Sequence, residues 1–220
     1  MHTLIIDTSG RYSTAAVSRD GALAGFTTLE AQPLIHLHGQ IREMCAHLSL
    51  EISRIGRIAV VSGPGSWTGL NIGVTAAKTL AQVLRAGVVE LSSLDALVAA
   101  ERWLGGQVHA LLDAKRGNVY CAAYPTGAAG RVEVKAARAR VLAFADWCEA
   151  VRTENGTPLV VEYGDVFGER LAECLPGSCQ RSRSVLTPEG LLEALLARGD
   201  EEATGAEAMS LAPRYMQRLV

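Results

Sequence analysis

The chain has 220 residues, of which 49% are hydrophobic and 20% are charged, and its net charge at pH 7 is −2. This composition excludes a mainly disordered chain, because enough apolar side chain is present to bury a core. The near-neutral charge argues against a protein that binds nucleic acid on its own, since such proteins usually carry a strong positive excess. The length allows one large domain or two small ones.

The cysteines and the N-terminal residues indicate a compartment. The five cysteines are odd in number, scattered, and form no CxxC pair, which argues against a disulfide framework and against a zinc site. The first residues lack the basic start of a signal peptide, and Asp7 interrupts their apolar run. Residues 58–77 carry no charge, but glycines and a proline break this stretch, so it is not a membrane span. We expect a protein of the reducing cytoplasm.

The first half of the chain predicts strands and helices in a regular order. Strands are expected at residues 4–6, ending at Asp7, and at 13–18, 23–28, 58–62 and 88–91. Asp20-Gly21 is a strong signal for a hairpin turn. Helices are expected at residues 34–48, 70–84 and 93–103, the last opened by a serine cap.

The second half follows a similar order. Strands are expected at residues 108–112, 118–124 and 159–163, with a weaker one near 131–142. Helices are expected at residues 143–152, 166–174 and 189–198. LIIDTSGRYSTAAV from Leu4 and ALLDAKRGNVYCAAY from Ala110 each read as a strand ending in Asp, a turn and an alternating strand. This repeat predicts a duplicated α/β unit of the ribonuclease-H type, with mixed sheets flanked by helices.

A glycine-rich block, GPGSWTGLNIG, links a predicted strand to the helix at 70–84. Free N–H groups at such a helix start can bind an anion. The phosphate-loop and dinucleotide motifs both fail here, because Leu70 follows Gly69 and Thr68 stands at the last glycine position of GxGxxG. We therefore favour a rigid strand-to-helix turn capped by Ser66 or Thr68, with anion binding as the alternative.

The helix at 70–84 has more apolar surface than one sheet can cover. Its polar residues form one narrow stripe, consisting of Asn71, Thr75, Lys78, Gln82 and Arg85. A helix that lies on a sheet needs only one apolar stripe. The excess predicts either a protein–protein interface or burial between two lobes of the same chain.

Two aspartates stand at corresponding places of the repeat. Asp7, with Thr8 and Ser9, and Asp113, with Lys115 and Arg116, each follow a predicted strand. Carboxylates that face each other across a cleft hold Mg²⁺ in nucleotide-dependent phosphotransferases. The alternative is that each aspartate only ends its strand and bonds local N–H groups.

Five segments together resemble a known family. They are IIDTS, GPGSWTGLNIGVTAAKTLA, SSLDALV, LLDAKRGNVYCAAY and APRYMQRL, and they resemble the bacterial TsaB (YeaZ) family over the whole chain. The resemblance implies an actin-like (ASKHA) fold of two ribonuclease-H-like lobes, at residues 1–104 and 105–220, with the last helix packing back on the first lobe. It also implies a non-catalytic subunit that pairs with TsaD, the enzyme that threonylcarbamoylates adenosine 37 of tRNA.

The resemblance further implies partners and a pairing surface. TsaE joins the assembly, the chain forms a homodimer when its partner is absent, and tRNA is contacted only through the complex. The pairing surface maps to the helices at 34–48 and 70–84. The implied interface residues are Leu37, His38, Ile41, Met44, Cys45, Leu70, Gly73, Val74, Ala77, Lys78 and Ala81, with Val74 and Ala77 expected on an exposed helix face.

The catalytic relative carries an HxxxH metal pair, whereas here Arg42 stands four residues after His38. The resemblance therefore implies no metal ligands and no catalytic residues. The aspartate turns are interpreted as a vestigial nucleotide cleft. Whether ATP or ADP binds in or near the interface of the complex stays open. The alternative function is a small ASKHA phosphotransferase that uses Asp7 and Asp113, and a peptidase ranks last because no hydrolytic motif is present.

Overall fold

A computed structural model describes residues 1–30, 33–134, 138–154, 157–164, 166–175, 180–199 and 205–215. The chain divides into two compact units, Met1–Ser93 with Leu191–Tyr215 (unit 1), and Leu94–Gly190 (unit 2). The units divide between Ser93 and Leu94, whereas the sequence placed the boundary after residue 104. None of the described helices has the length and hydrophobicity that a membrane span requires.

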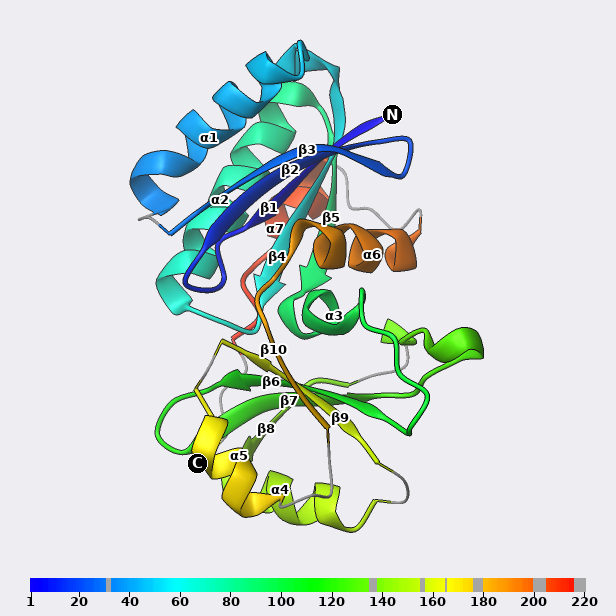
Figure 1. Cartoon of the computed structure of the whole chain (residues 1–220). Coiled ribbons are helices and arrows are strands. Elements are labelled where there is room, and N and C mark those ends of the chain that lie inside the picture. The colour runs from blue at the N-terminus through cyan, green and yellow to red at the C-terminus, as the bar shows by residue number, and fades with distance from the viewer. Residues whose placement is uncertain are drawn as a thin grey trace. The chain divides into compact units, whose positions relative to one another are not determined.

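Unit 1 is built on a five-stranded mixed sheet (Figure 1). Its strands are β1 (His2–Asp7), β2 (Ser13–Arg19), β3 (Ala22–Leu29), β4 (Ile55–Gly63) and β5 (Gly87–Ser92), in the order β3-β2-β1-β4-β5. The first three strands are antiparallel, and β4 and β5 run parallel to β1. Asp20 and Gly21 join β2 to β3 with positive φ angles of 50° and 81°, as the predicted tight hairpin turn requires.

Three helices of unit 1 meet beside this sheet. They are α1 (Pro33–His47), α2 (Trp67–Leu84) and α7 (Gly205–Ser210), and α6 (Pro188–Arg198) enters the unit at Leu191. Helix α1 contacts β2 and β3, α2 contacts β1, β4 and β5, and α7 contacts β5. Helix α2 also contacts both α1 and α7. Much of the apolar surface that its own sheet does not cover is therefore covered within the same unit, whereas Val83 is 74% exposed.

Unit 2 repeats the strand order of unit 1. Its strands are β6 (Val108–Asp113), β7 (Asn118–Tyr124), β8 (Arg140–Ala143), β9 (Leu159–Tyr163) and β10 (Gln180–Ser184), in the order β10-β9-β6-β7-β8. Again three strands are antiparallel and two run parallel to the first. Helices α4 (Phe144–Arg152) and α5 (Gly168–Cys174) share one hydrophobic cluster with the sheet (Figure 1). The predicted repeat and its α/β class with two mixed sheets are confirmed.

Four details of the predicted elements are wrong. The helix α3 (Ser93–Val98) is shorter than the expected 93–103, because the backbone beyond it pairs elsewhere: Trp103 N–H donates to Gly130 O at 2.8 Å. Within the described residues of the expected strand at 131–142, β8 is the regular part, and Arg131 and Val132 form isolated bridges; residues 135–137 lie outside the described part of the chain. Strand β10 and helix α7 were not predicted, since neither carries a clear periodic pattern.

The sequence argued against a disulfide framework, but the structure contains one disulfide bond. Cys148 and Cys174 are bonded, with 6.2 Å between their Cα atoms and a sequence separation of 26. Helices α4 and α5 bring the two sulfurs together inside one cluster, which no local spacing signals. Cys45 and Cys121 are free and buried, and Cys179 lies outside the described residues.

Candidate functional site

The first aspartate turn is closed inside unit 1. Asp7 ends β1 and is 2% exposed, and its Oδ1 accepts hydrogen bonds from Ser9 N at 2.8 Å and from Ser9 Oγ at 2.7 Å. Burial raises the pKa of Asp7 to about 6, although the two Ser9 hydrogen bonds act to lower it. Thr8 and Ser9 are buried as well. Both hydrogen bonds to Oδ1 therefore come from within its own turn.

The glycine-rich block is what covers this turn. A Cβ added at Gly69 would lie 1.8 Å from Thr8 O, one at Gly73 would lie 2.3 Å from Thr8 Oγ1, and one at Gly65 would lie 2.5 Å from Ser9 O. Two hydrogen bonds tie the surfaces together, from Thr8 Oγ1 to Gly69 O and from Ser66 N to Ser9 O, each at 2.7 Å.

The spacing of these glycines now has a structural reason. Positions 65, 69 and 73 recur every four residues, so Gly69 and Gly73 share the face of α2 that meets the turn. Ser66 caps the helix by accepting from Gly69 N at 3.3 Å. The block therefore allows close backbone approach, which agrees with the rigid-turn interpretation.

The C-terminal segment lies against the same block. Arg214 N donates to Ser62 O at 2.7 Å, and Arg214 Nε donates to Glu90 Oε2 at 2.8 Å. Tyr215 stacks on Trp67, with 6.3 Å between ring centroids, and Trp67 is 67% exposed. Sequence reasoning missed these contacts, because Glu90 and Arg214 are 124 residues apart and no local pattern connects them.

The second aspartate turn is open. Asp113 Oδ1 accepts from Lys115 N at 2.7 Å, and its Oδ2 pairs with Lys115 Nζ at 2.6 Å. The side chain of Lys115 is 80% exposed, and that of Asp113 is 23% exposed. Lys115, Arg116 and Gly117 all have positive φ angles. Asp7 belongs to unit 1 and Asp113 to unit 2, so a cleft between them stays a prediction.

The expected interface side chains lie mostly in the hydrophobic core of unit 1. Each of the following is at most 6% exposed: Leu37, Ile41, Met44, Cys45, Leu70, Val74, Ala77 and Ala81. Gly73 is buried against Thr8, Lys78 is half-buried, and only His38 is exposed. The placement of Val74 and Ala77 on an exposed face is wrong, because both pack into the core beneath α2.

Lys78 also has a role inside the unit. Its Nζ donates to Leu211 O at 3.0 Å, so it binds the segment that follows α7. From Thr75 onward the exposed residues of α2 are instead Thr75, Thr79, Gln82 and Val83, and those of α1 include Ile35, His38 and Arg42. Of the predicted polar stripe, Thr75 and Gln82 thus lie on the exposed face of α2, whereas Lys78 binds the segment after α7.

Comparison with known protein families identifies relatives of this chain. Residues 34–153, more than half of the chain, match the sequence profile of the TsaD family, described as tRNA N6-adenosine threonylcarbamoyltransferase. The chain belongs to the TsaD family. A relative of this TsaD-family chain in Bacillus subtilis (strain 168), the "tRNA threonylcarbamoyladenosine biosynthesis protein TsaB", is 29% identical over 180 residues, which cover 81% of this chain and 78% of the relative.

Solved structures agree in fold with this TsaD-family chain. A Pseudomonas aeruginosa protein described as similar to peptidase YeaZ has a TM-score of 0.76 at 23% identity, covering 98% of this chain and 99% of the other. YeaZ from the same organism has a TM-score of 0.72 at 23% identity and the same coverage. The ethanolamine utilization protein EutJ from Carboxydothermus hydrogenoformans has a TM-score of 0.52 at 13% identity, covering 89% and 90%. The expected resemblance to TsaB (YeaZ) and the actin-like fold class are confirmed.

Histidines do not gather into a metal site within the part of this TsaD-family chain that the structure describes. His38 is exposed on α1, and the residue four positions later is Arg42. Among the described residues, no three His, Cys, Asp or Glu side chains lie together in a way that could hold a metal ion.

Proposed function

We propose that this TsaD-family chain acts in the biosynthesis of threonylcarbamoyladenosine in tRNA as a non-catalytic subunit. It pairs with TsaD, which transfers threonylcarbamoyl to adenosine 37, and the pair is joined by TsaE. The similarity to TsaB and the match to the TsaD family support the pathway. The observation that carries the non-catalytic role is the first aspartate turn, which the chain's own glycine-rich block covers.

The alternative phosphotransferase would need the Asp7 carboxylate to reach a nucleotide-bound metal ion. Instead, Asp7 is 2% exposed, and Ser9 occupies its Oδ1 twice. Gly69 and Gly73 also lie so close to Thr8 that a Cβ at either position would clash with it. Titration of the isolated chain with Mg-ATP tests this point. We expect that Asp7→Ala leaves any Mg-ATP binding unchanged. Binding by the native chain that is lost in Asp7→Ala would favour the phosphotransferase.

The proposed pairing surface is the outer face of α1 and α2. Ile35 and Val83 are apolar side chains that are 67% and 74% exposed on these helices. His38, Thr75 and Gln82 are exposed on the same two helices. This assignment replaces the buried residues that the sequence suggested. We propose that the homodimer uses the same surface. We also propose that ATP or ADP binds in or near the interface of the complex.

The function is tested by reconstitution. The partner transferase is assayed for modified adenosine in tRNA with and without this chain, all other components being present. We expect little product without the chain and restored product with it. Full activity of the partner alone would overturn the proposal.

The surface is tested by charge insertion. Val83→Glu should weaken the heterodimer at least about tenfold, because an unpaired charge in an interface is costly. Val166→Glu is the matched control, since Val166 is 50% exposed on unit 2. Circular dichroism checks that both variants fold. A heterodimer that tolerates Val83→Glu as well as Val166→Glu would show that the surface lies elsewhere.

A further inference from the structure

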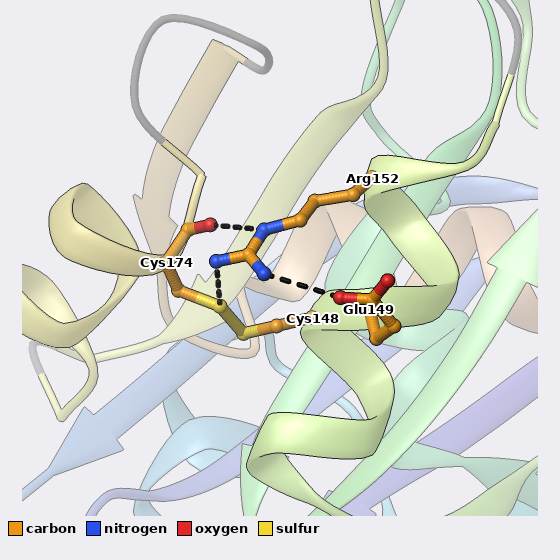
Figure 2. The surroundings of a disulfide bond; sticks show 4 residues. All are labelled: Cys148, Glu149, Arg152 and Cys174. Atoms are coloured by element: carbon orange, nitrogen blue, oxygen red, sulfur yellow. Dashed lines mark hydrogen bonds and ion pairs between the residues drawn. A yellow bond between two sulfur atoms is a disulfide. The ribbon is translucent and has the colours of Figure 1, made fainter.

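The disulfide of unit 2 joins two sulfurs in different surroundings. Cys148 lies on α4 and is 1% exposed inside the hydrophobic cluster that α4 and α5 share. Cys174 ends α5 and is only half-buried. Figure 2 shows the Arg152 guanidinium beside the Cys174 sulfur, with Nη2 3.9 Å from Sγ. In the reduced chain, one sulfur therefore stands near solvent and a cation, and the other stays in an apolar core.

Hydrogen bonds to Cys174 and Glu149 hold the Arg152 guanidinium in position. Its Nε donates to the backbone oxygen of Cys174 at 2.8 Å, and its Nη1 donates to Glu149 Oε2 at 3.1 Å (Figure 2). The Glu149 side chain is 70% exposed, so water screens its negative charge. A neighbouring cation favours the thiolate, which is the reactive form of cysteine.

The two free cysteines lack the partial exposure of Cys174. Cys45 and Cys121 are buried, and desolvation raises the pKa of both thiols, that of Cys121 to about 11. Thiols in such surroundings are inert. Among the cysteines that the structure describes, Cys174 alone combines partial exposure with a guanidinium next to its sulfur.

We propose that Cys174 is a site of oxidative modification by hydroperoxides in the reduced chain, and that Cys148 resolves the product. The Cys174 thiolate attacks one oxygen of the peroxide, an S–O bond forms, the O–O bond breaks, and the leaving hydroxide or alkoxide takes up a proton. The Cys148 thiol then loses its proton, and its sulfur displaces the hydroxyl of the Cys174 sulfenic acid as water. The two thiols supply the two electrons that reduce the peroxide, and the observed disulfide is the product.

This site does not depend on the proposed function. All of its atoms belong to unit 2, whereas the proposed pairing surface belongs to unit 1. Failure of partner binding in the reconstitution test would leave the cysteine chemistry unchanged. Failure of the cysteine tests would likewise leave the proposed function unchanged.

The first test locates the reacting sulfur. Cys174 and Cys179 fall in one tryptic peptide, between Arg170 and Arg181, so all chains carry Cys179→Ser. The reduced full-length chain is treated with hydrogen peroxide and the sulfenic-acid probe dimedone. With Cys148→Ser, we expect the adduct on Cys174; with Cys174→Ser, labelling of Cys148 should be at least about tenfold lower. Labelling of Cys148 equal to or above that of Cys174 would overturn the proposal.

The second test separates the guanidinium from simple exposure. The rate of alkylation of Cys174 by iodoacetamide is measured on the reduced Cys148→Ser, Cys179→Ser chain. Arg152→Gln should slow this rate about three- to tenfold, because the nearby cation is lost. Glu149→Gln is the matched control, which keeps the cation and should not slow the reaction. An unchanged rate in Arg152→Gln, with folding confirmed by circular dichroism, would contradict the role of Arg152.

Discussion

Units 1 and 2 share one strand order but differ in what covers each sheet. In unit 1, the helix between the two parallel strands is α2, with 18 residues, and it packs onto the β1–β2 turn. In unit 2, the corresponding helix is α5, with 7 residues, and the β6–β7 turn stays open. The long helix α2 covers the β1–β2 turn. The short helix α5 is linked to α4 by a disulfide.

The same strand-Asp-turn pattern therefore has two electrostatic outcomes. The Asp7 carboxylate is buried and bonded to Ser9, and burial raises its pKa to about 6. The Asp113 carboxylate pairs with the exposed Lys115 side chain. The difference comes from α2, which packs against the first turn. Four tests can break or sharpen this comparison.

The largest effect is expected at the contact between α2 and the first turn. Gly69→Ala places a Cβ 1.8 Å from Thr8 O, which should cost about 3–5 kcal/mol of unfolding free energy or prevent folding. Gly117→Ala in the open turn meets no atom within 4 Å and has only its φ of +78° to oppose it, so we expect about 1–2 kcal/mol. Denaturant unfolding measures both, and equal costs would show that the first turn is not closely packed.

The disulfide should contribute next, in unit 2 only. Replacing Cys148 and Cys174 together by Ala should lower the unfolding free energy by about 2–4 kcal/mol, because the bond restricts the unfolded chain across 26 residues. Dithiothreitol should destabilise the native chain by a similar amount and leave the double variant unchanged. A native chain whose stability does not respond to dithiothreitol would contradict this account.

Asp7 predicts a pH dependence with a definite sign. Because folding raises its pKa from 3.8 to about 6, the folded chain holds a proton that the unfolded chain releases between these values. Stability contributed by this group is thus present below about pH 4, is lost as the pH rises to about 6, and amounts to about 3 kcal/mol.

Asp7→Asn should remove this slope and raise the unfolding free energy at pH 7 by about 1–3 kcal/mol. Denaturant unfolding between pH 4 and 7 provides the measurement. Asp113→Asn is the matched control and should keep the slope of the native chain. If Asp7→Asn also keeps that slope, the buried carboxyl is not its source.

The smallest effect is expected at the open turn. Lys115→Ala removes an ion pair whose lysine side chain is 80% exposed, and such pairs contribute less than about 1 kcal/mol. The effect should shrink further in 1 M salt, as expected for screening between exposed charges. A larger cost that persists in salt would show that the second turn is as tightly built as the first.

The local sequence determined much of this protein. Alternating and helical patterns predicted most strands and helices, Asp20-Gly21 predicted the hairpin turn, and the repeated LIID and LLDAK segments predicted two similar units. These features depend on backbone preferences and on side-chain periodicity within a few residues. The glycine-rich block fails the strict phosphate motifs and was expected to form a capped strand-to-helix turn, and Ser66 caps α2 there.

Only the tertiary structure decided what covers each surface. A hydrophobic pattern shows that Val74 or Ala77 is buried, but it does not distinguish a partner protein from the same chain, and here α1 and α7 complete the cover. The partners of Gly69, Arg214 and Cys148 likewise lie far away in sequence. Their proximity arises only when the sheet and its helices have assembled, since packing, ion pairing and disulfide formation depend on distance in space.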